Sequence, residues 1–209
     1  MRREDVTFTD QTDQQGSMFI AGPQAGETIS SGLQSPLPAE PLGNVEVAFE
    51  GHPLSIRRCP AALDGFWISG CGESLDKLAP VLADAGCGQI DDTVVEMLRI
   101  EAGIPRYGVD LDDQNLPQEV NRNAQAINFT KGCYLGQETV ARLDALGHVN
   151  WLLTGLVLEP GPLPAAGTPF ELDGKLTARV TPSCYSPLPD GPLSIDSCRG
   201  EPPPRGSAP

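Results

Sequence analysis

The sequence has few basic residues for its length, few aromatic side chains and only two histidines. Of its 209 residues, 14 are Lys or Arg and 28 are Asp or Glu, which gives a net charge of −14. A molecule with this charge repels phosphate backbones, so general binding of DNA or RNA is disfavoured. Glycine and proline are abundant instead, at 23 and 21 residues, and this content excludes a helical bundle or a coiled coil.

Long apolar runs are also missing. The longest run, residues 151–158, contains Thr154 and Gly155 and is typical of a strand. A membrane span needs about 20 apolar residues. The first ten residues carry acids and hydroxyls where a signal peptide needs an apolar stretch. These absences predict a cytoplasmic protein with no membrane partner.

The six cysteines lack the spacing of a metal site. No two of them form a C-x-x-C pair, and neither His52 nor His148 lies near a cysteine pair, so a zinc or iron–sulfur cage built by this chain alone is disfavoured. Cys71 and Cys87 flank a predicted helix that, at about 1.5 Å per residue, holds them roughly 20 Å apart, too far for a disulfide. We interpret the cysteines as reduced thiols.

Apolar periodicity predicts short strands and three main helices. The predicted strands cover residues 6–9, 18–20, 45–49, 54–56 and 66–68, with a hairpin over 170–176. The predicted helices cover residues 73–85, 93–102 and 137–146, and a glycine follows each of them closely. A further weak helix is expected over 25–32, and residues 105–128 are expected to be rich in loops.

The change in character near Asn150 predicts a domain boundary. We expect an α+β core over residues 1–150 and a small all-β unit over residues 151–190. Beyond residue 190 the apolar alternation is lost and prolines follow, which predicts a disordered tail over residues 191–209.

The densest group of chemically distinctive residues is segment 131–142, with the sequence KGCYLGQETVAR. It places Cys133 in a glycine-flanked turn before a helix, two residues after Lys131. Backbone amides, the positive end of the helix dipole and the lysine all stabilise a thiolate, so this cysteine is expected to be reactive. The alternative is that the glycines only serve the turn and that Cys133 is a small buried apolar residue.

A second polar segment spans residues 99–110, with the sequence RIEAGIPRYGVD. Arg99 and Glu101 stand at the end of a predicted helix, and Arg106 and Tyr107 follow it. One interpretation is an ion pair at the helix end, and the other is a polar, aromatic-lined wall for a flat anionic ligand. The nearby acids, Asp110, Asp112 and Asp113, lack the spacing of a calcium loop and are expected to form a solvated face.

The two segments together resemble the folate-binding YgfZ family, relatives of the glycine-cleavage T-protein (aminomethyltransferase). The pattern K-G-C-Y-x-G-Q-E, at residues 131–138, is specific to the YgfZ branch, and R-x-E-A-G, at residues 99–103, is shared more loosely with the T-protein. The resemblance extends over most of residues 4–187. Family members begin with a further segment, so the resemblance implies that the N-terminal part of the core is missing here, along with the catalytic aspartate of the T-protein.

The resemblance implies an α+β fold, in which an aminomethyltransferase-like folate-binding core is followed by a small C-terminal β-barrel. It implies tetrahydrofolate or a derivative as cofactor and iron–sulfur proteins as partners. By the same resemblance Cys133 is the functional thiol. The residues expected to bind the cofactor are Arg99, Glu101, Arg106, Lys131, Tyr134, Gln137, Glu138 and Arg142.

Three functions remain open from the sequence. The first is a folate-binding accessory protein for the assembly or repair of iron–sulfur clusters, linked to tRNA modification. The second is a folate-dependent aminomethyltransferase or other one-carbon transferase, which needs a positioned carboxylate that no motif here supplies. The third is an inactive gene fragment.

Overall fold

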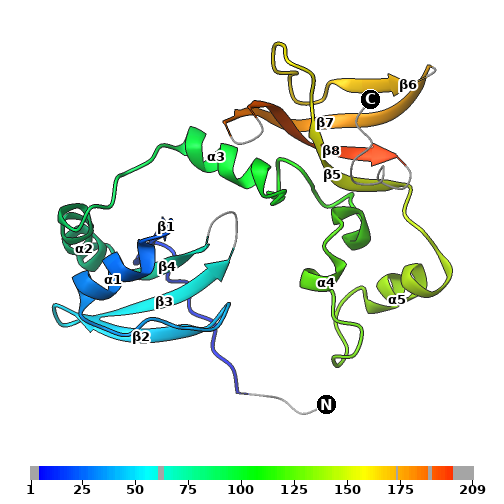
Figure 1. Ribbon diagram of the computed structural model, residues 1–209. Coiled ribbons are helices and arrows are strands. Elements are labelled where there is room, and N and C mark those ends of the chain that lie inside the picture. Colours follow the sequence, from blue (N-terminus) through cyan, green and yellow to red (C-terminus); the bar gives the residue numbers. More distant parts are fainter. Residues whose placement is uncertain (1–4, 61–63, 173, 188–189, 200–209) are drawn as a thin grey trace. The chain divides into compact units, whose positions relative to one another are not determined.

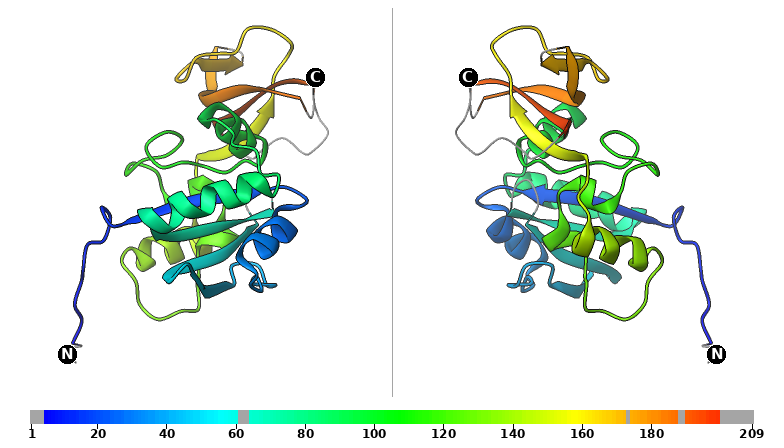
Figure 2. Two further views of the ribbon diagram at one scale, coloured as in Figure 1. Left: turned by 90° about the vertical axis from the view of Figure 1, so that its left-hand side faces the viewer. Right: turned by 90° about the vertical axis from the view of Figure 1, so that its right-hand side faces the viewer.

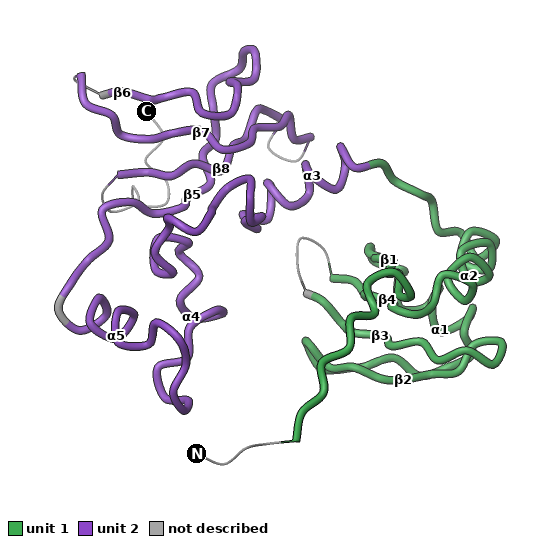
Figure 3. The backbone as a smooth tube through the Cα atoms, turned by 180° about the vertical axis from the view of Figure 1, so that it is seen from behind, with its two compact units in different colours: residues 1–91 green, residues 92–209 purple. Residues whose placement is uncertain are grey.

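The chain folds into two compact units, Met1–Asp91 and Asp92–Pro209, coloured separately in Figure 3. The computed structural model describes residues 5–60, 64–172, 174–187 and 190–199. Each unit contains one four-stranded antiparallel sheet together with helices, so the predicted mixture of helix and sheet is confirmed. The boundary expected near Asn150 coincides with the start of a strand inside the second unit and stays a prediction.

The first unit is built on the strand order β1-β4-β3-β2 (Figure 1). The strands are β1 (Gln15–Ala21), β2 (Asn44–Phe49), β3 (His52–Pro60) and β4 (Asp64–Cys71). Strands β2, β3 and β4 follow one another as antiparallel neighbours, and β1 pairs with β4 at the edge. The alternating apolar residues that predicted these strands therefore line one face of the sheet.

Helices α1 (Ala25–Leu33) and α2 (Gly72–Asp84) cover that face. Ile29 of α1 and Leu78 of α2 are fully buried, and they belong to one cluster with Ile56 and Ile68 of the sheet. Two helices packed on one side of an antiparallel sheet are the usual way for an α+β unit to bury its apolar surface.

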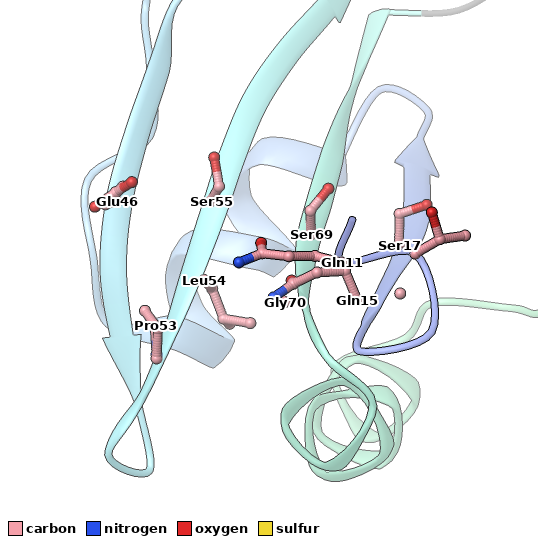
Figure 4. A pocket seen from close by; sticks show the side chains of 11 residues that line it. Gln11, Gln15, Ser17, Glu46, Pro53, Leu54, Ser55, Ser69 and Gly70 are labelled. Carbon is pink, nitrogen blue, oxygen red and sulfur yellow. The ribbon is translucent and has the colours of Figure 1, made fainter. Parts of the chain in front are cut away.

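The opposite face of this sheet carries a polar row beside the neighbouring rings of Phe19 and Trp67, whose centres are 5.1 Å apart. Cross-strand pairing places Ser17 opposite Ser69, Ser69 opposite Ser55, and Ser55 opposite Glu46, so that four strands contribute one polar row. These side chains line a hollow of about 580 Å³, shown in Figure 4. It is larger than the hollow of about 260 Å³ that Phe19, Ala25 and Cys87 help to line in the same unit.

The second unit has the strand order β5-β8-β7-β6. Its strands are β5 (Trp151–Val157), β6 (Pro169–Leu172), β7 (Lys175–Ser186) and β8 (Gly191–Arg199). The hairpin predicted over 170–176 is confirmed by the pairing of β6 with β7. In the described residues the two edge strands, β5 and β6, do not pair with each other.

The tail predicted from residue 191 onward is wrong as far as Arg199. Residues 191–199 form β8, which lies between β5 and β7 and is the most buried strand of its sheet. Its polar residues misled the prediction because two of them are buried and bond to each other inside the sheet: the Ser194 hydroxyl donates to Asp196 Oδ2 at 2.8 Å. The remainder of the predicted tail, residues 200–209, lies outside the described residues.

Helices of the second unit are α3 (Asp92–Glu101), the 3-10 helix η1 (Pro117–Val120), α4 (Asn123–Ala126) and α5 (Gln137–Leu146). Helix α3 packs on β7 and β8, and its Ile100 is buried with Leu153 and Ile195. The predicted ends of α5 are confirmed, because a glycine precedes the helix and another follows it.

The strand predicted over residues 6–9 is wrong. Residues 5–11 have no regular structure, and Figure 2 shows them running away from the sheet of the first unit. Phe8 is 94% exposed, so the alternation that predicted a strand has no partner to pack against. None of the helices described here has the length and apolar character that crossing a membrane requires.

Candidate functional site

The loop before α5 presents Cys133 to solvent. The cysteine is a free, exposed thiol that lies three residues before Gly136, the N-cap of the helix. Gly136 has a φ of 82°, a left-handed conformation that other residues adopt only at a cost, so glycine is required at this turn. The interpretation of Cys133 as a buried apolar residue is therefore wrong, and its reactivity stays a prediction.

Side chains around Cys133 hold the loop in shape. The Asn128 side chain accepts hydrogen bonds from the backbone amides of Thr130 and Lys131 at 2.9 and 3.0 Å. The Lys131 ammonium lies 5.5 Å from the centre of the Tyr134 ring, within the range of a cation–π interaction. Two predicted site residues, Lys131 and Tyr134, are thus brought together beside the thiol.

Tyr134 and Leu135 differ in their exposure to solvent. The Tyr134 hydroxyl is buried and has no hydrogen-bond partner among the described residues. Leu135 is fully exposed, at 103% of its reference area. An exposed leucine two residues after an exposed thiol gives this loop an apolar contact point.

Helix α5 carries the other residues of the motif. Glu138 and Arg142 lie one turn apart and line a cavity of about 400 Å³ with Leu116, Thr139, Leu143 and Gly147. Arg142 is exposed and has no ion-pair partner in the part of the chain that the structure describes. Gln137, at the first position of the helix, is half-buried and does not line this cavity.

Arg99 lies in a buried ion-pair network. Its side chain is 8% exposed, its Nη1 donates to Asp110 Oδ2 at 2.8 Å, and its Nε donates to Glu96 Oε2 at 2.8 Å. Arg106 joins the network, because its backbone amide donates to Asp110 and its guanidinium donates to Glu96. Hydrogen bonding from Arg99 lowers the pKa of the Glu96 carboxyl, which keeps the network charged.

The network agrees with the interpretation of Arg99 as part of an ion pair, but with different partners. Glu101 is not one of them, since its carboxylate accepts a hydrogen bond from Ser186 of β7. Asp110, expected on a solvated face, is only 6% exposed, while Asp112 and Asp113 are exposed. The expectation for Asp110 is therefore wrong, because a cation eleven residues earlier in the chain neutralises it.

The structure brings the predicted site residues into two groups. Arg99 and Arg106 share the carboxylates of Glu96 and Asp110, and the residues of segment 131–142 surround the loop and helix α5. No hydrogen bond or ion pair between described residues of the two segments joins these groups. Among the described residues there is also no group of three or more His, Cys, Asp or Glu side chains placed to hold a metal ion.

Sequence reasoning missed Asp110 and Thr181, which tie α3 to the sheet. The Thr181 hydroxyl of β7 lies 2.8 Å from Asp110 Oδ1, on the other side of the carboxylate from Arg99. The only signal in the sequence is that Asp110 closes the segment that Arg99 opens. A contact between residues 71 positions apart leaves no local pattern.

Comparisons with known proteins confirm the resemblance drawn from the two motifs. The chain is 26% identical to an aminomethyltransferase of Streptomyces avermitilis over 91% of its own length and 54% of that protein. It is 44% identical over 79 residues to the tRNA-modifying protein YgfZ of Escherichia coli, which covers 36% of this chain and 23% of YgfZ. No family model matches the chain.

The fold comparison points the same way. The structure matches that of the glycine cleavage system aminomethyltransferase T from Bartonella henselae with a TM-score of 0.75 at 20% identity, over 88% of this chain and 52% of that protein. At this identity the match shows the fold. The chain spans about half the length of the aminomethyltransferases that it matches.

Proposed function

We propose that the protein is a folate-binding accessory protein of the YgfZ type, acting in the assembly or repair of iron–sulfur clusters in other proteins. Among these partners we include enzymes that modify tRNA, since a relative that is 44% identical over 79 residues is described as a tRNA-modifying protein. The observation that carries the proposal is the exposed Cys133, at the tip of a loop shaped by Gly136 and preceding α5.

Exposure of the thiol favours a protein partner over a small substrate. Catalysis on small molecules needs a site that excludes water, and such sites are concave. Cys133 and Leu135 instead stand on the outside of the loop, where a second protein can approach them. The Lys131 ammonium, 5.5 Å from the centre of the Tyr134 ring, adds a positive charge to the same loop.

We place the folate at the cavity beside α5. The Arg142 guanidinium suits the carboxylates of a folate tail, and Leu116 and Leu143 supply apolar walls for the uncharged part. The residues present therefore fit the group. Lys131 and Tyr134 are candidates for contact at its other end.

Arg99, Glu101 and Arg106 act in this proposal by positioning the chain. The Arg99 guanidinium is occupied by two carboxylates, so it has little capacity left for a ligand. Its effect is to fix the end of α3 against β7, since Asp110 also contacts Thr181.

The proposal also includes the C-terminal barrel and the location of the protein in the cell. We take β5–β8 to be the small C-terminal β-barrel of the family, because the register shift between Val180 and Ser183 bends β7 in the way that curves a sheet toward closure. We place the protein in the cytoplasm.

The proposal is tested by replacing the thiol in cells that lack their own copy of the protein. A Cys133→Ala variant is expected to leave a cluster-dependent tRNA-modifying enzyme inactive, while the wild type restores its activity. The matched control is Cys59→Ala, which removes a thiol outside the motif. Full rescue by the Cys133→Ala variant would remove the thiol from the mechanism.

A second candidate function is one-carbon transfer on folate. It is favoured by the similarity to aminomethyltransferases over 91% of the chain and by Glu138, a carboxylate in the cavity that Arg142 lines. Turnover of a methylene- or methyl-folate by the purified protein, abolished in Glu138→Gln, would place this function first. Folate binding without turnover would favour the accessory role.

A further inference from the structure

A second cysteine, Cys71 in the first unit, lies beside a histidine. Its sulfur is 3.6 Å from Nδ1 of His52, within the range of an S–H to N hydrogen bond. The two residues are 19 positions apart in the sequence and meet because β3 begins at His52 where its antiparallel neighbour β4 ends at Cys71. A thiol within reach of an imidazole is the arrangement that generates a thiolate nucleophile.

The far side of the imidazole faces a carboxylate. Glu73 Oε1 lies 3.7 Å from His52 Nε2, and the same oxygen accepts a hydrogen bond from Lys77 at 2.8 Å. A carboxylate near Nε2 favours the tautomer that carries its proton there, and this leaves Nδ1 free to accept the thiol proton. Cys71, His52 and Glu73 thus form a nucleophile, a base and an orienting carboxylate in sequence.

The start of α2 stabilises the thiolate further. Cys71 is the N-cap residue of this 13-residue helix, so the positive end of the helix dipole points toward the cysteine. Ser74, which is fully buried, has its Oγ 3.4 Å from the sulfur and donates to the Cys71 carbonyl at 2.7 Å. The hydrogen bond between the sulfur and the Ser74 side chain, and then the bond from the Ser74 backbone amide, lower the pKa of the Cys71 thiol.

The other charges near the site are Glu73, Lys77 and Glu50. The Glu73 carboxylate opposes ionisation of the thiol, but it is paired with Lys77, which also lies 3.7 Å from Glu50. Cys71 is half-buried as a residue, so we expect small reagents to reach it.

From this geometry we propose that Cys71 is a nucleophilic thiol that forms mixed disulfides with low-molecular-weight disulfides such as oxidised glutathione. The thiol proton passes to His52 Nδ1, and the thiolate attacks one sulfur of the small disulfide. A new S–S bond to Cys71 forms while the original S–S bond breaks, and the second half leaves as a thiolate that takes up the proton. The incoming disulfide is the oxidant, so the electrons balance.

This site is independent of Cys133, which lies in the other unit, and the first unit provides its own reference thiols. Cys59 and Cys87 are half-buried like Cys71, but among the described residues neither has a hydrogen-bond partner at its sulfur. They report how fast a cysteine in the same unit reacts without an adjacent base.

The first test uses the unmodified full-length protein. The rate of carbamidomethylation by iodoacetamide is measured for each cysteine from pH 5 to 9 by mass spectrometry of the peptides. Near pH 7, Cys71 is expected to react about tenfold faster than Cys59 and Cys87, with a midpoint at lower pH. Equal rates and equal midpoints for the three thiols would overturn the proposal.

The second test uses oxidised glutathione as the probe and two variants. His52→Gln is expected to slow both mixed-disulfide formation and alkylation at Cys71 without changing the rates at Cys59 and Cys87. Glu50→Gln, which alters an acid contacting Lys77 and not the imidazole, is the matched control and is expected to react like the wild type. Circular dichroism verifies that both variants fold, and an unchanged rate at Cys71 in a folded His52→Gln variant would contradict the proposed role of the imidazole.

Discussion

The two units are stabilised by different means. Among the described residues of the first unit, nine apolar residues and one polar side chain, Ser74, are buried. Among the described residues of the second unit seven apolar residues are buried. Six polar or charged side chains are buried with them, and hydrogen bonds made by several of these tie the end of α3 to the sheet. These residues are Arg99, Asp110, Gln118, Ser186, Ser194 and Asp196. We infer that packing volume decides the stability of the first unit, and that charge pairing and pH decide the stability of the second.

Tryptophan fluorescence can report the two units separately. The sequence has two tryptophans, Trp67 in the first unit and Trp151 in the second. Trp151→Phe leaves a reporter for the first unit, and Trp67→Phe leaves one for the second. Urea unfolding followed in these two backgrounds measures the free energy of unfolding of each unit.

The largest effect is expected from breaking the buried ion pair of the second unit. Asp110→Ala removes one of the two carboxylates that pair with the buried Arg99, and it also removes the acceptor of the Arg106 amide, which costs about 3–5 kcal/mol. The Trp151 signal should shift to lower urea concentration while the Trp67 signal stays in place. The exposed Asp112→Ala serves as the control, and a shift of the same size in that variant would contradict the assigned role of Asp110.

A cavity in the first unit should have the next largest effect. Leu78 is fully buried between α2 and the sheet, so Leu78→Ala is expected to cost about 2–5 kcal/mol. Here the Trp67 transition should move and the Trp151 transition should not. Val6→Ala, at a side chain that is 61% exposed, gives the reference for a change without burial.

Mild acidification, from pH 7 to about pH 5, should stabilise the second unit relative to the first. Burial raises the pKa of Asp196 to about 6 from 3.8, and its Oδ1 has no partner among the described residues. The contribution is present in full below about pH 4 and is lost as the pH rises through about 6, up to about 3 kcal/mol in all. Asp196→Asn should flatten this pH dependence in the Trp151 signal, and a slope that persists in the variant would assign it to another group.

The smallest of these effects is expected at the turn before α5. Gly136→Ala forces a left-handed conformation on a residue with a Cβ and should cost about 1–2 kcal/mol. The Cys133 loop should also change shape, which alkylation of Cys133 would detect. Gly132→Ala is the matched control, since Gly132 has no positive φ among the described glycines and open space for a Cβ.

Local signals in the sequence were sufficient to predict a helix where residues at its ends or along one of its faces mark it. Helix α5 was predicted from Gln137 to Leu146 because glycines stand at both ends, and α2 was predicted from its apolar stripe. Strand β8 was missed because Ser194 and Asp196 are hydrogen-bonded within the sheet, which a polarity pattern reads as solvent exposure.

The candidate sites also differ in how far the sequence could predict them. The Cys133 loop could be recognised from one continuous segment. The buried position of Asp110 depends on Arg99 and Thr181, and the Cys71 site depends on His52, 19 residues away across a strand pair. Contacts of this kind are set by the register of the sheets, and no spacing in the sequence specifies it.

The central functional claim is that the second unit binds folate beside α5, and calorimetric titration of the purified protein with tetrahydrofolate tests it most directly. We expect saturable binding by the wild type and by Arg179→Gln, an exposed arginine on β7, and at least about tenfold weaker binding by Arg142→Gln, because that guanidinium lines the cavity. Absence of binding by a wild-type protein that unfolds cooperatively, or equal binding by Arg142→Gln, would contradict the account.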